Sequence, residues 1–536
     1  MYDIIIKNGS VVDGTGKKAY KADVAIKRDV IAEIAPEVTE KARRIIDASG
    51  KMVIPGFIDP HTHEEWVLFT EGIYNIFLRQ GVTTVVNGNC GHSVVPGPSK
   101  SVIDYYTNNG LMSFRQQRAY YARFPEWEDF AGYAKAVEEK GTNLNFVTLL
   151  GHGIIRQTVM GGAFPGQPSG DEWREIEEII RKNMEQGAWG ISYGLDYVPS
   201  RYADVDEMAR VSKIIKEYDG VSAAHLRHYI GVAEATKEFL EVAKKSGCKV
   251  QISHLKPTCP EAFELVKSAI EKEGISARID TIPRSTGHCV SKSRLIQFII
   301  AISDELFDKG TEGVKEALAN PEGREMIKKD AYIFAGVKED KFIVCSEDPE
   351  LENRSVADIA RERGIDPDEC MLDLIGDDKD YVFWLGGPSR SDFPAEGHCP
   401  EIVANPYVSV GSDEIKGDIE FPFDWYELQR RGSFPNFVNE YMSKGVAFEE
   451  IVRRNTGMVS EHFGIPKRGR LEEGFFADIA VIDLQNYKYP APDQMHYKTP
   501  EMTASGVDYV FVNGVAVLAE GEAKAVYPGR VLKKSK

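Results

Sequence analysis

The sequence predicts an α/β fold: a (β/α)8 barrel of the TIM type, with a small β-sandwich domain built from both termini and a long insertion between barrel strands seven and eight. Three observations indicate this fold. Apolar runs alternate with amphipathic stretches eight times through the middle of the chain, both ends alternate like strands, and one connection is far longer than the others. Repeated strand–helix alternation is typical of a closed parallel sheet with helices outside it.

The two ends of the chain are predicted to form one small β-unit. The pattern of short strands separated by turns occurs near both ends of the chain. It is found in "YDIIIKNGSVVDG" near the N-terminus and in "RGRLEEGFFADIAVIDLQ", "VDYVFVNGVAVLAEG" and "GRVLKK" near the C-terminus. Strands from one terminus alone would leave an apolar face and unpaired edges, so we expect the two sets to combine. The predicted domains are residues 1–55 with 470–536 for the sandwich, and 56–469 for the barrel.

The barrel strands are predicted from apolar runs bounded by turn residues. Amphipathic helices fill most of the gaps, for example at 170–187 and 231–247, each of which ends in glycine as helices often do. The eight predicted strands cover residues 52–59, 81–89, 143–151, 187–195, 220–226, 248–255, 275–282 and 406–413.

The connection between the seventh and eighth strands spans about residues 283–405 and contains helical segments of its own. Ordinary connections in compact domains are much shorter than this. We therefore expect an insertion that covers the mouth of the barrel.

Composition and charge disfavour several classes of protein. The formal net charge of −18 would repel nucleic acid, and the longest apolar runs, such as "LIQFIIAI" at 295–302, are too short to cross a membrane. The N-terminus lacks the features of a signal peptide. The seven cysteines are scattered and have no CxxC spacing, which indicates reduced thiols and a cytoplasmic location.

Polar residues follow the predicted strands at the points where these strands end, except for one histidine placed within the sixth. Because the carboxyl ends of parallel strands open on one face of a barrel, these residues are expected to converge in one pocket. Taken singly, each histidine could be a core residue, the cysteine a small apolar residue, and the aspartate a helix cap. The predicted set consists of His61, His63, Cys90, His225, His254 and Asp413.

These residue types together indicate a metal centre. His61 and His63 are two apart on an extended segment, so they point to the same side and lie about 7 Å apart at the backbone. Imidazole, thiolate and carboxylate suit Zn²⁺, and a free coordination position would make such a site catalytic. Six ligands exceed the needs of one tetrahedral site, so either two neighbouring metals bridged by Cys90, or one tight and one weak site, would use them.

Several motifs show what the chain resembles. "GFIDPHTH" on the first strand, histidines on the fifth and sixth, and aspartate after the eighth resemble the amidohydrolase superfamily. Within this superfamily, the chain resembles the D-aminoacylase (N-acyl-D-amino-acid deacylase) group in the motifs "GVTTVVNGNCG", "LLGHGIIR", "GAWGISYGLDY", "HLR", "ISHLK" and "SFPNFV". The resemblance covers nearly the whole chain, and Cys90 is its most specific element, since many relatives use a carbamylated lysine or a glutamate there.

The resemblance implies roles for the predicted metal ligands. His61 and His63 would bind the more buried of one or two Zn²⁺ ions, Cys90 would bridge, and His225 and His254 would hold the second ion. Asp413 would be both a ligand and the group that carries a proton from water to the leaving nitrogen. His152 matches the family without being one of its ligands.

The resemblance also implies substrate contacts. Arg227 and Lys256 match positions that face the substrate carboxylate, and Tyr197 matches a tyrosine that lines the site. The alternatives are that the two cations are surface or supporting charges and that the tyrosine only packs.

Two stretches depart from the family pattern. In "DTIPRSTGHC", Ile282, Arg284 and His288 replace two tyrosines and a serine, which makes Arg284 and His288 candidate substrate contacts. In "HLRHY", Tyr229 replaces an acid that often follows the arginine.

The predicted function is hydrolysis of the amide bond of N-acyl-D-amino acids, or related N-acyl amino acids, by a zinc-dependent amidohydrolase. The predicted partner is a small molecule with a carboxylate, and a homo-oligomer is possible. One alternative is a cyclic amidase resembling hydantoinases and dihydroorotases, although these usually carry lysine at the position of Cys90. Another is a non-catalytic structural protein, but such proteins have typically lost ligands.

Overall fold

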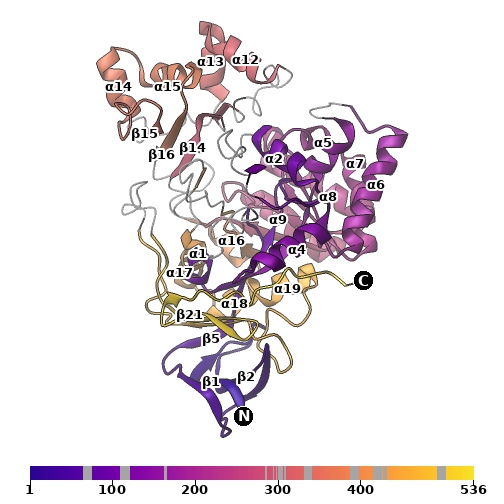
Figure 1. Ribbon diagram of the computed structural model, residues 1–536, viewed down its shortest axis with the longest axis vertical. Coiled ribbons are helices and arrows are strands. Elements are labelled where there is room, and N and C mark those ends of the chain that lie inside the picture. The colour runs from indigo at the N-terminus through magenta and orange to yellow at the C-terminus, as the bar shows by residue number, and fades with distance from the viewer. Residues whose placement is uncertain are drawn as a thin grey trace.

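The structure is a computed structural model that describes residues 1–63, 65, 75–108, 121–122, 124–161, 166–283, 287–293, 295–296, 299, 306, 309–330, 341–386, 397–414, 425–426, 431–491 and 502–535. Figure 1 shows an elongated molecule, with the sheet that contains the N-terminus at one end, helices and strands in the middle, and a smaller helical unit at the other end.

Strands from both ends of the chain share one nine-stranded sheet, of order β22-β21-β20-β19-β5-β1-β2-β3 with β4 beside β1. The two halves meet where β5 and β19 pair antiparallel, with Ile54 opposite Ala480. Apolar residues such as Ile6, Val24 and Phe511 from both halves pack in one cluster. The strands are β1 (Tyr2–Val11), β2 (Tyr20–Lys27), β3 (Val30–Ala35), β4 (Ala42–Asp47), β5 (Met52–Pro55), β19 (Ile479–Ile482), β20 (Val507–Val512), β21 (Val515–Ala519) and β22 (Glu522–Ala523).

The last segment that we expected in this sheet lies elsewhere. Val531, in "GRVLKK", forms a parallel bridge with Phe146 of the central strands. The Phe146 amide donates to the Arg530 carbonyl, and the Leu532 amide donates to the Phe146 carbonyl, both at 2.8 Å. The expectation that this segment completes the small β-unit was wrong, because its backbone is paired with β8 (Asn145–Thr148).

The central strands are all parallel and form two runs, β6-β7-β8 and β9-β10-β11-β12-β13-β17. Only Leu149 separates β8 from β9, and a parallel bridge between Thr62 and Glu414 joins the first strand end to the last. The eight strand positions therefore form a closed ring. Besides β8, they are β6 (Phe57–Asp59), β7 (Val82–Asn87), β9 (Leu150–Gly151), β10 (Gly190–Gly194), β11 (Val221–His225), β12 (Lys249–Ile252), β13 (Ala277–Thr281) and β17 (Val408–Val410).

Each predicted barrel strand is present, but the first is divided. Residues 52–59 form β5 in the terminal sheet and β6 in the ring, with Gly56 between them. A Cβ on Gly56 would lie 2.1 Å from a Thr83 side-chain carbon, so this crossing accepts only glycine.

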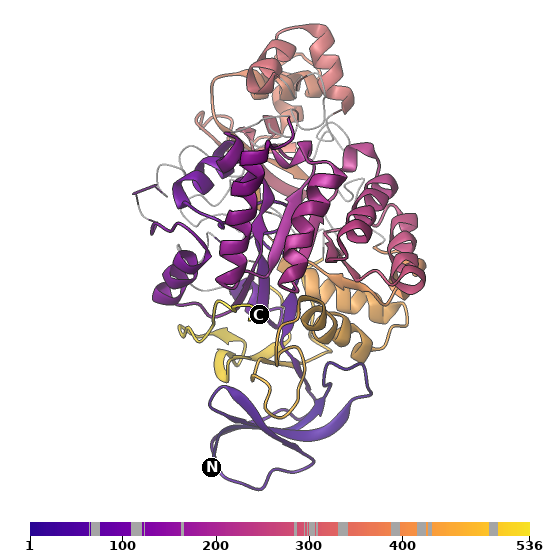
Figure 2. The same ribbon diagram turned by 90° about the vertical axis from the view of Figure 1, so that its right-hand side faces the viewer.

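Helices cover the outside of the ring, as Figure 2 shows. Helix α6 (Gly170–Glu185) begins with a capping box between Ser169 and Glu172, and α8 (Val232–Ser246) ends at the left-handed Gly247, as its sequence predicts. The other helices outside the insertion are α1 (Asn75–Leu78), α2 (Ser99–Asn108), α4 (Phe130–Lys140), α5 (His152–Met160), α7 (Val205–Glu217), α9 (Pro260–Glu273), α16 (Pro400–Ala404), α17 (Ser433–Ser443), α18 (Phe448–Arg454) and α19 (Gly457–Phe463). No helix within the described residues is long and apolar enough to cross a membrane.

The connection after β13 folds around a core of its own, which includes Val290, Ile343 and Phe383. Its sheet has the order β15-β16-β14-β18. The unit lies at the opposite end of the molecule from the terminal sheet (Figure 1). Its elements are β14 (Gly287–Ser291), α12 (Gly310–Leu318), α13 (Pro321–Asp330), β15 (Lys341–Ser346), α14 (Val356–Arg363), α15 (Pro367–Gly376), β16 (Tyr381–Gly386) and β18 (Trp425–Tyr426).

The predicted limits of this insertion, 283–405, differ from the structure at the C-terminal side. Strand β18 follows β17 in the chain and pairs with β14, so the unit also receives residues from beyond the last strand of the ring. Helix α16 lies within the predicted limits, but Ile402 and Val403 are buried in the main core with the ring helices.

Candidate metal centre

The six predicted ligands converge at the carboxyl ends of five central strands. His61 and His63 follow β6, Cys90 follows β7, His225 ends β11, and Asp413 follows β17. We expected His254 within its strand, but it lies two residues beyond the end of β12, with φ of 31°. Because all five strands run parallel, residues far apart in the sequence meet on one face of the ring.

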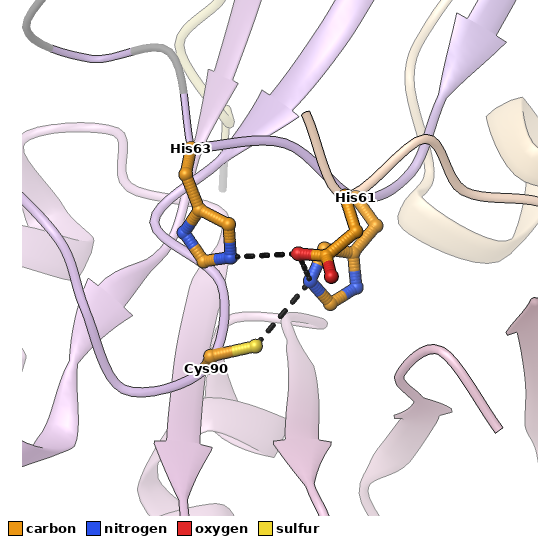
Figure 3. Close-up of side chains that lie close together, drawn as sticks. His61, His63 and Cys90 are labelled. Atoms are coloured by element: carbon orange, nitrogen blue, oxygen red, sulfur yellow. Dashed lines mark hydrogen bonds and ion pairs between the residues drawn. The ribbon is translucent and has the colours of Figure 1, made fainter. Parts of the chain in front are cut away.

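One group contains His61, His63, Cys90 and Asp413, whose ligand atoms all lie within 4.8 Å of one another. The Oδ1 atom of Asp413 is 3.2 Å from Nε2 of His63 and 3.4 Å from Nε2 of His61. The Cys90 Sγ atom is 3.3 Å from the same nitrogen of His61. Figure 3 shows these two imidazoles and the thiol directed toward a common space.

A second group contains Cys90, His225 and His254. Cys90 Sγ is 3.3 Å from Nε2 of His254, and that nitrogen is 2.9 Å from Nδ1 of His225. Cys90 is therefore common to both groups. This is the position expected for a residue that bridges two sites.

The backbone is unusual at the same positions. Cys90 and Asp413 have φ of 54° and 50°, a region that residues other than glycine seldom adopt. Gly91, next to Cys90, has φ of 73°, and a Cβ there would lie 2.6 Å from the Gly194 amide nitrogen. The "NGNCG" sequence therefore places the thiol by a tight turn packed against β10, and strained backbone of this kind gathers at functional sites.

Two buried carboxylates that the sequence analysis missed support the histidines. Asp280 in β13 lies 3.1 Å from Nδ1 of His61 and accepts a hydrogen bond of 2.7 Å from the His254 amide. Asp59, two residues before His61, accepts from the amides of His61 and Ser412, both at 3.1 Å. In the sequence, each of them is a single acidic residue within an apolar strand. A carboxylate is costly to bury unless it has a partner, so this pattern could have indicated a supporting role.

The electrostatics of the centre follow from this crowding. Burial by itself raises the pKa of the Cys90 thiol, but His61 and His254 outweigh it and hold that pKa well below its ordinary value. Burial lowers the pKa of His63, yet Asp413 and Cys90 raise it to about 9. Since metal ligands must be deprotonated, a cation that binds here would release the proton that His63 holds at neutral pH.

The predicted substrate residues have different surroundings. Arg227 is buried and donates to Glu238 at 3.1 Å, to the Ala203 carbonyl at 2.6 Å and to the Arg201 carbonyl. Tyr197 is half-buried, with its ring centre 4.7 Å from those of His225 and His92. The half-buried Lys256 lies close enough to His228 to lower the pKa of that imidazole, after the larger effect of burial.

Two of the predicted substrate contacts cannot be placed relative to the centre. Arg284 lies outside the described residues, and the described part of His288 is its backbone in β14. The helix that Asp413 could have capped falls in 415–424, which also lies outside the described residues.

Asp196, His228 and His92 were not predicted to take part in the site, whereas His152 was expected beside it without being a ligand. Asp196 and His228 form a third group with His225. His92, two residues after Cys90, is buried with Nδ1 3.0 Å from the Tyr105 hydroxyl. His152 is buried between Ser200 and Glu207, at 3.0 and 3.1 Å, which agrees with a supporting rather than a ligand role.

Comparison with known proteins identifies the relatives of this chain. Residues 44–290 match the model of the amidohydrolase family. A D-aminoacylase and an N-acyl-D-glutamate deacylase, both from Alcaligenes xylosoxydans xylosoxydans, are each 27% identical to this chain. The matches cover 99% of this chain and 97% and 96% of the two relatives, respectively.

A solved structure agrees with these relatives. The N-acyl-D-glutamate deacylase of Bordetella bronchiseptica, complexed with zinc and a phosphonate inhibitor that mimics the tetrahedral intermediate, has 25% identity and a TM-score of 0.74 over 99% of both chains. The fold is thus the α/β, TIM-barrel type of amidohydrolases. These matches agree with the resemblance indicated by the motifs: over nearly its whole length the chain is similar to amidohydrolases of the D-aminoacylase group.

Proposed function

We propose that this protein is a zinc-dependent hydrolase that cleaves the amide bond of N-acyl-D-amino acids to a carboxylate and a free amino acid. The observation that carries the proposal is the meeting of six side chains from five strand ends in two groups that share Cys90. Full-length relatives that deacylate N-acyl-D-amino acids support the choice of reaction.

The donor set fits zinc. His61 and His63 with Asp413 would hold one ion, His225 and His254 the other, and Cys90 would bridge them. Imidazole nitrogens, a thiolate and a carboxylate are the ligands that Zn²⁺ prefers, and the lowered pKa of Cys90 keeps its sulfur in the form that binds a metal. One or two ions per chain agree with this arrangement.

A bound Zn²⁺ supplies a Lewis acid that polarises a carbonyl group and lowers the pKa of water toward neutrality. Asp413 would accept the water proton at its carboxylate and deliver it to the leaving nitrogen. Its Oδ1 atom lies within 3.4 Å of both His61 and His63, so the carboxylate is held at the centre before substrate arrives.

The substrate is expected to carry a carboxylate, and the cations that would bind it are Lys256 and Arg284, with Tyr197 and His288 beside it. Arg227 was also predicted here, but the structure pairs its guanidinium with Glu238 and two carbonyls. We therefore assign Arg227 a smaller share in substrate binding than the sequence indicates.

We also propose how the chain is divided. The sheet of both termini would form the small sandwich domain, about 1–55 and 470–528, because two separate clusters of its apolar side chains are buried. The ring and its helices would form the catalytic domain, and the unit with its own core after β13 would be the insertion.

A screen of purified, zinc-loaded protein tests the function. N-Acyl-D-amino acids, their L-enantiomers and cyclic amides would be offered in parallel, with release of free amine as the signal. We expect turnover of N-acyl-D-amino acids that is lost in a Cys90→Ala variant.

Two outcomes would contradict the proposal. Preferred hydrolysis of cyclic amides would favour a cyclic amidase, for which the changed "IPRSTGHC" segment leaves room. Zinc-loaded protein without activity on any of the three classes would favour a non-catalytic role.

A further inference from the structure

Asp196 connects one candidate metal ligand to the loop after β10. Its Oδ2 atom lies 3.0 Å from Nε2 of His225 and 3.0 Å from Nδ1 of His228. Its other oxygen, Oδ1, accepts a hydrogen bond of 3.0 Å from the His228 amide. The carboxylate thus contacts both histidines of the "HLRH" segment.

The contact between Asp196 and His225 determines which imidazole nitrogen of His225 can bind a metal. A neutral imidazole has one N–H, and an ionised carboxylate can only accept a hydrogen bond. With Asp196 at Nε2, the proton is held there and the lone pair is left on Nδ1. That atom lies 2.9 Å from Nε2 of His254, on the side where Cys90 stands.

The loop that carries Asp196 is itself held on two sides. Arg227 donates to the carbonyls of Arg201 and Ala203 while paired to Glu238 in α8. His152 in α5 contacts the Ser200 hydroxyl at 3.0 Å. The carboxylate is therefore supported by the surrounding helices, so it can determine the orientation of His225.

We propose that Asp196 is a positioning residue that orients His225 toward the second metal, with Arg227 and His152 holding its loop. The inference rests on the proposed zinc function. Carboxylates that accept from a ligating histidine fix its tautomer and ring direction, and their loss typically costs about 10–100-fold in metal affinity.

Co²⁺ binding to metal-free protein, followed by visible absorption, tests the inference without reference to turnover. In Asp196→Asn we expect one of the two equivalents of Co²⁺, the one held by His225 and His254, to bind about 10–100-fold more weakly and the other to bind as in the unaltered protein. Asp196→Glu keeps an acceptor carboxylate and should give an intermediate affinity. Asp206→Asn removes an exposed carboxylate paired to Lys245 just after the same loop, and should change neither step.

The outcomes separate this inference from the proposed function. Unchanged affinity for both ions in Asp196→Asn, compared with the unaltered protein, would overturn the positioning role alone. A third equivalent of Co²⁺ that depends on Asp196 and His228 would also overturn it, because the carboxylate would then be a ligand. Unaltered protein that binds no second ion would overturn the inference together with the two-metal form of the proposed function.

Discussion

At the scale of single residues, Asp413 is the proposed proton carrier, the group that the proposed hydrolysis needs in addition to a bound metal. Its φ of 50° is a conformation that Asn adopts as readily as Asp, so Asp413→Asn should fold normally. Without a carboxylate to accept and donate the proton, we expect kcat to fall about 10²–10⁴-fold, as for the loss of a general acid–base group. Initial rates with the best substrate from the screen measure the effect.

The control for this variant is Asp219→Asn, which removes a surface aspartate paired to Lys249 and should leave the rate unchanged. Turnover by Asp413→Asn within a few-fold of the unaltered protein would exclude the proposed proton carrier.

Cys90 and Cys248 form a matched pair of buried thiols. Cys90 lies between two imidazoles at 3.3 Å, whereas Cys248 contacts the Ser222 hydroxyl and the Gly220 carbonyl at 3.6 Å. Elemental analysis of Cys90→Ala should show loss of at least half of the bound zinc, because the proposed bridge belongs to both sites. Cys248→Ala should retain it, and equal zinc content in the two variants would argue against a thiolate ligand.

At the scale of elements, a buried polar network joins the terminal sheet to the ring. Asp478, just before β19, pairs with Arg468, and their side chains are 4% and 3% exposed. Asp478 also accepts from the side chain of Asn145 in β8 at 3.1 Å and from the Asn513 amide at 2.8 Å. Such a network fixes how the two units meet, because each member satisfies the others.

Breaking this network should be costly. Asp478→Ala leaves the Arg468 charge buried without its partner, for which we expect about 3–5 kcal/mol of lost stability and a lower thermal unfolding midpoint in calorimetry. Asp29→Ala breaks an exposed pair with Arg530 and should cost about 0–1 kcal/mol. Similar midpoints for the two variants would contradict the proposed joint.

Helix α19 contains a titratable group whose position predicts acid sensitivity. His462 is buried, and burial first, then the cations Arg278 and Lys249, hold its pKa well below the ordinary value. Below about pH 6.5, His462 therefore becomes protonated in the unfolded chain while it stays neutral in the folded chain. The free energy of unfolding thus decreases as the pH falls below this value.

The variant His462→Phe removes this titration and keeps a ring. Between pH 7.5 and 5.5 it should lose about 1 kcal/mol less than the unaltered protein, measured by urea unfolding at both pH values. The same loss in both proteins would show that other groups cause any acid sensitivity.

At the scale of the whole molecule, metal should link activity to stability. Removal of zinc by a chelator is expected to abolish turnover and to lower the unfolding midpoint, because a ligand that binds only the folded state stabilises it by mass action. Added Zn²⁺ should restore both, and Mg²⁺, which prefers oxygen ligands, should not. A metal-free preparation with full activity would contradict the metal-dependent mechanism.

The strands and the convergence of the candidate ligands could be predicted because they depend on local patterns. Apolar runs identify parallel strands, and the histidines at 61, 63, 225 and 254 stand beside these runs in the sequence. Parallel topology alone then brings their ends to one face. The position of Cys90 was predictable for the same reason, although its left-handed backbone was not.

Other features depended on contacts between distant segments. The C-terminal "GRVLKK" has the pattern of a strand in either unit, and only its partner, Phe146, decides which. Strand β18 joins the insertion from beyond β17 in the same way. A pattern of apolar and polar residues specifies which face is buried, but not which neighbour buries it.

By itself, the sequence determined the strand order along the chain, the six candidate ligands and the resemblance to D-aminoacylases. The tertiary structure alone decided that Asp59, Asp196 and Asp280 support those ligands and that Arg227 pairs with Glu238. The physical reason is that a ligand type is a property of one side chain, whereas the carboxylate or cation that orients it is chosen by packing between strands and helices far apart in the sequence.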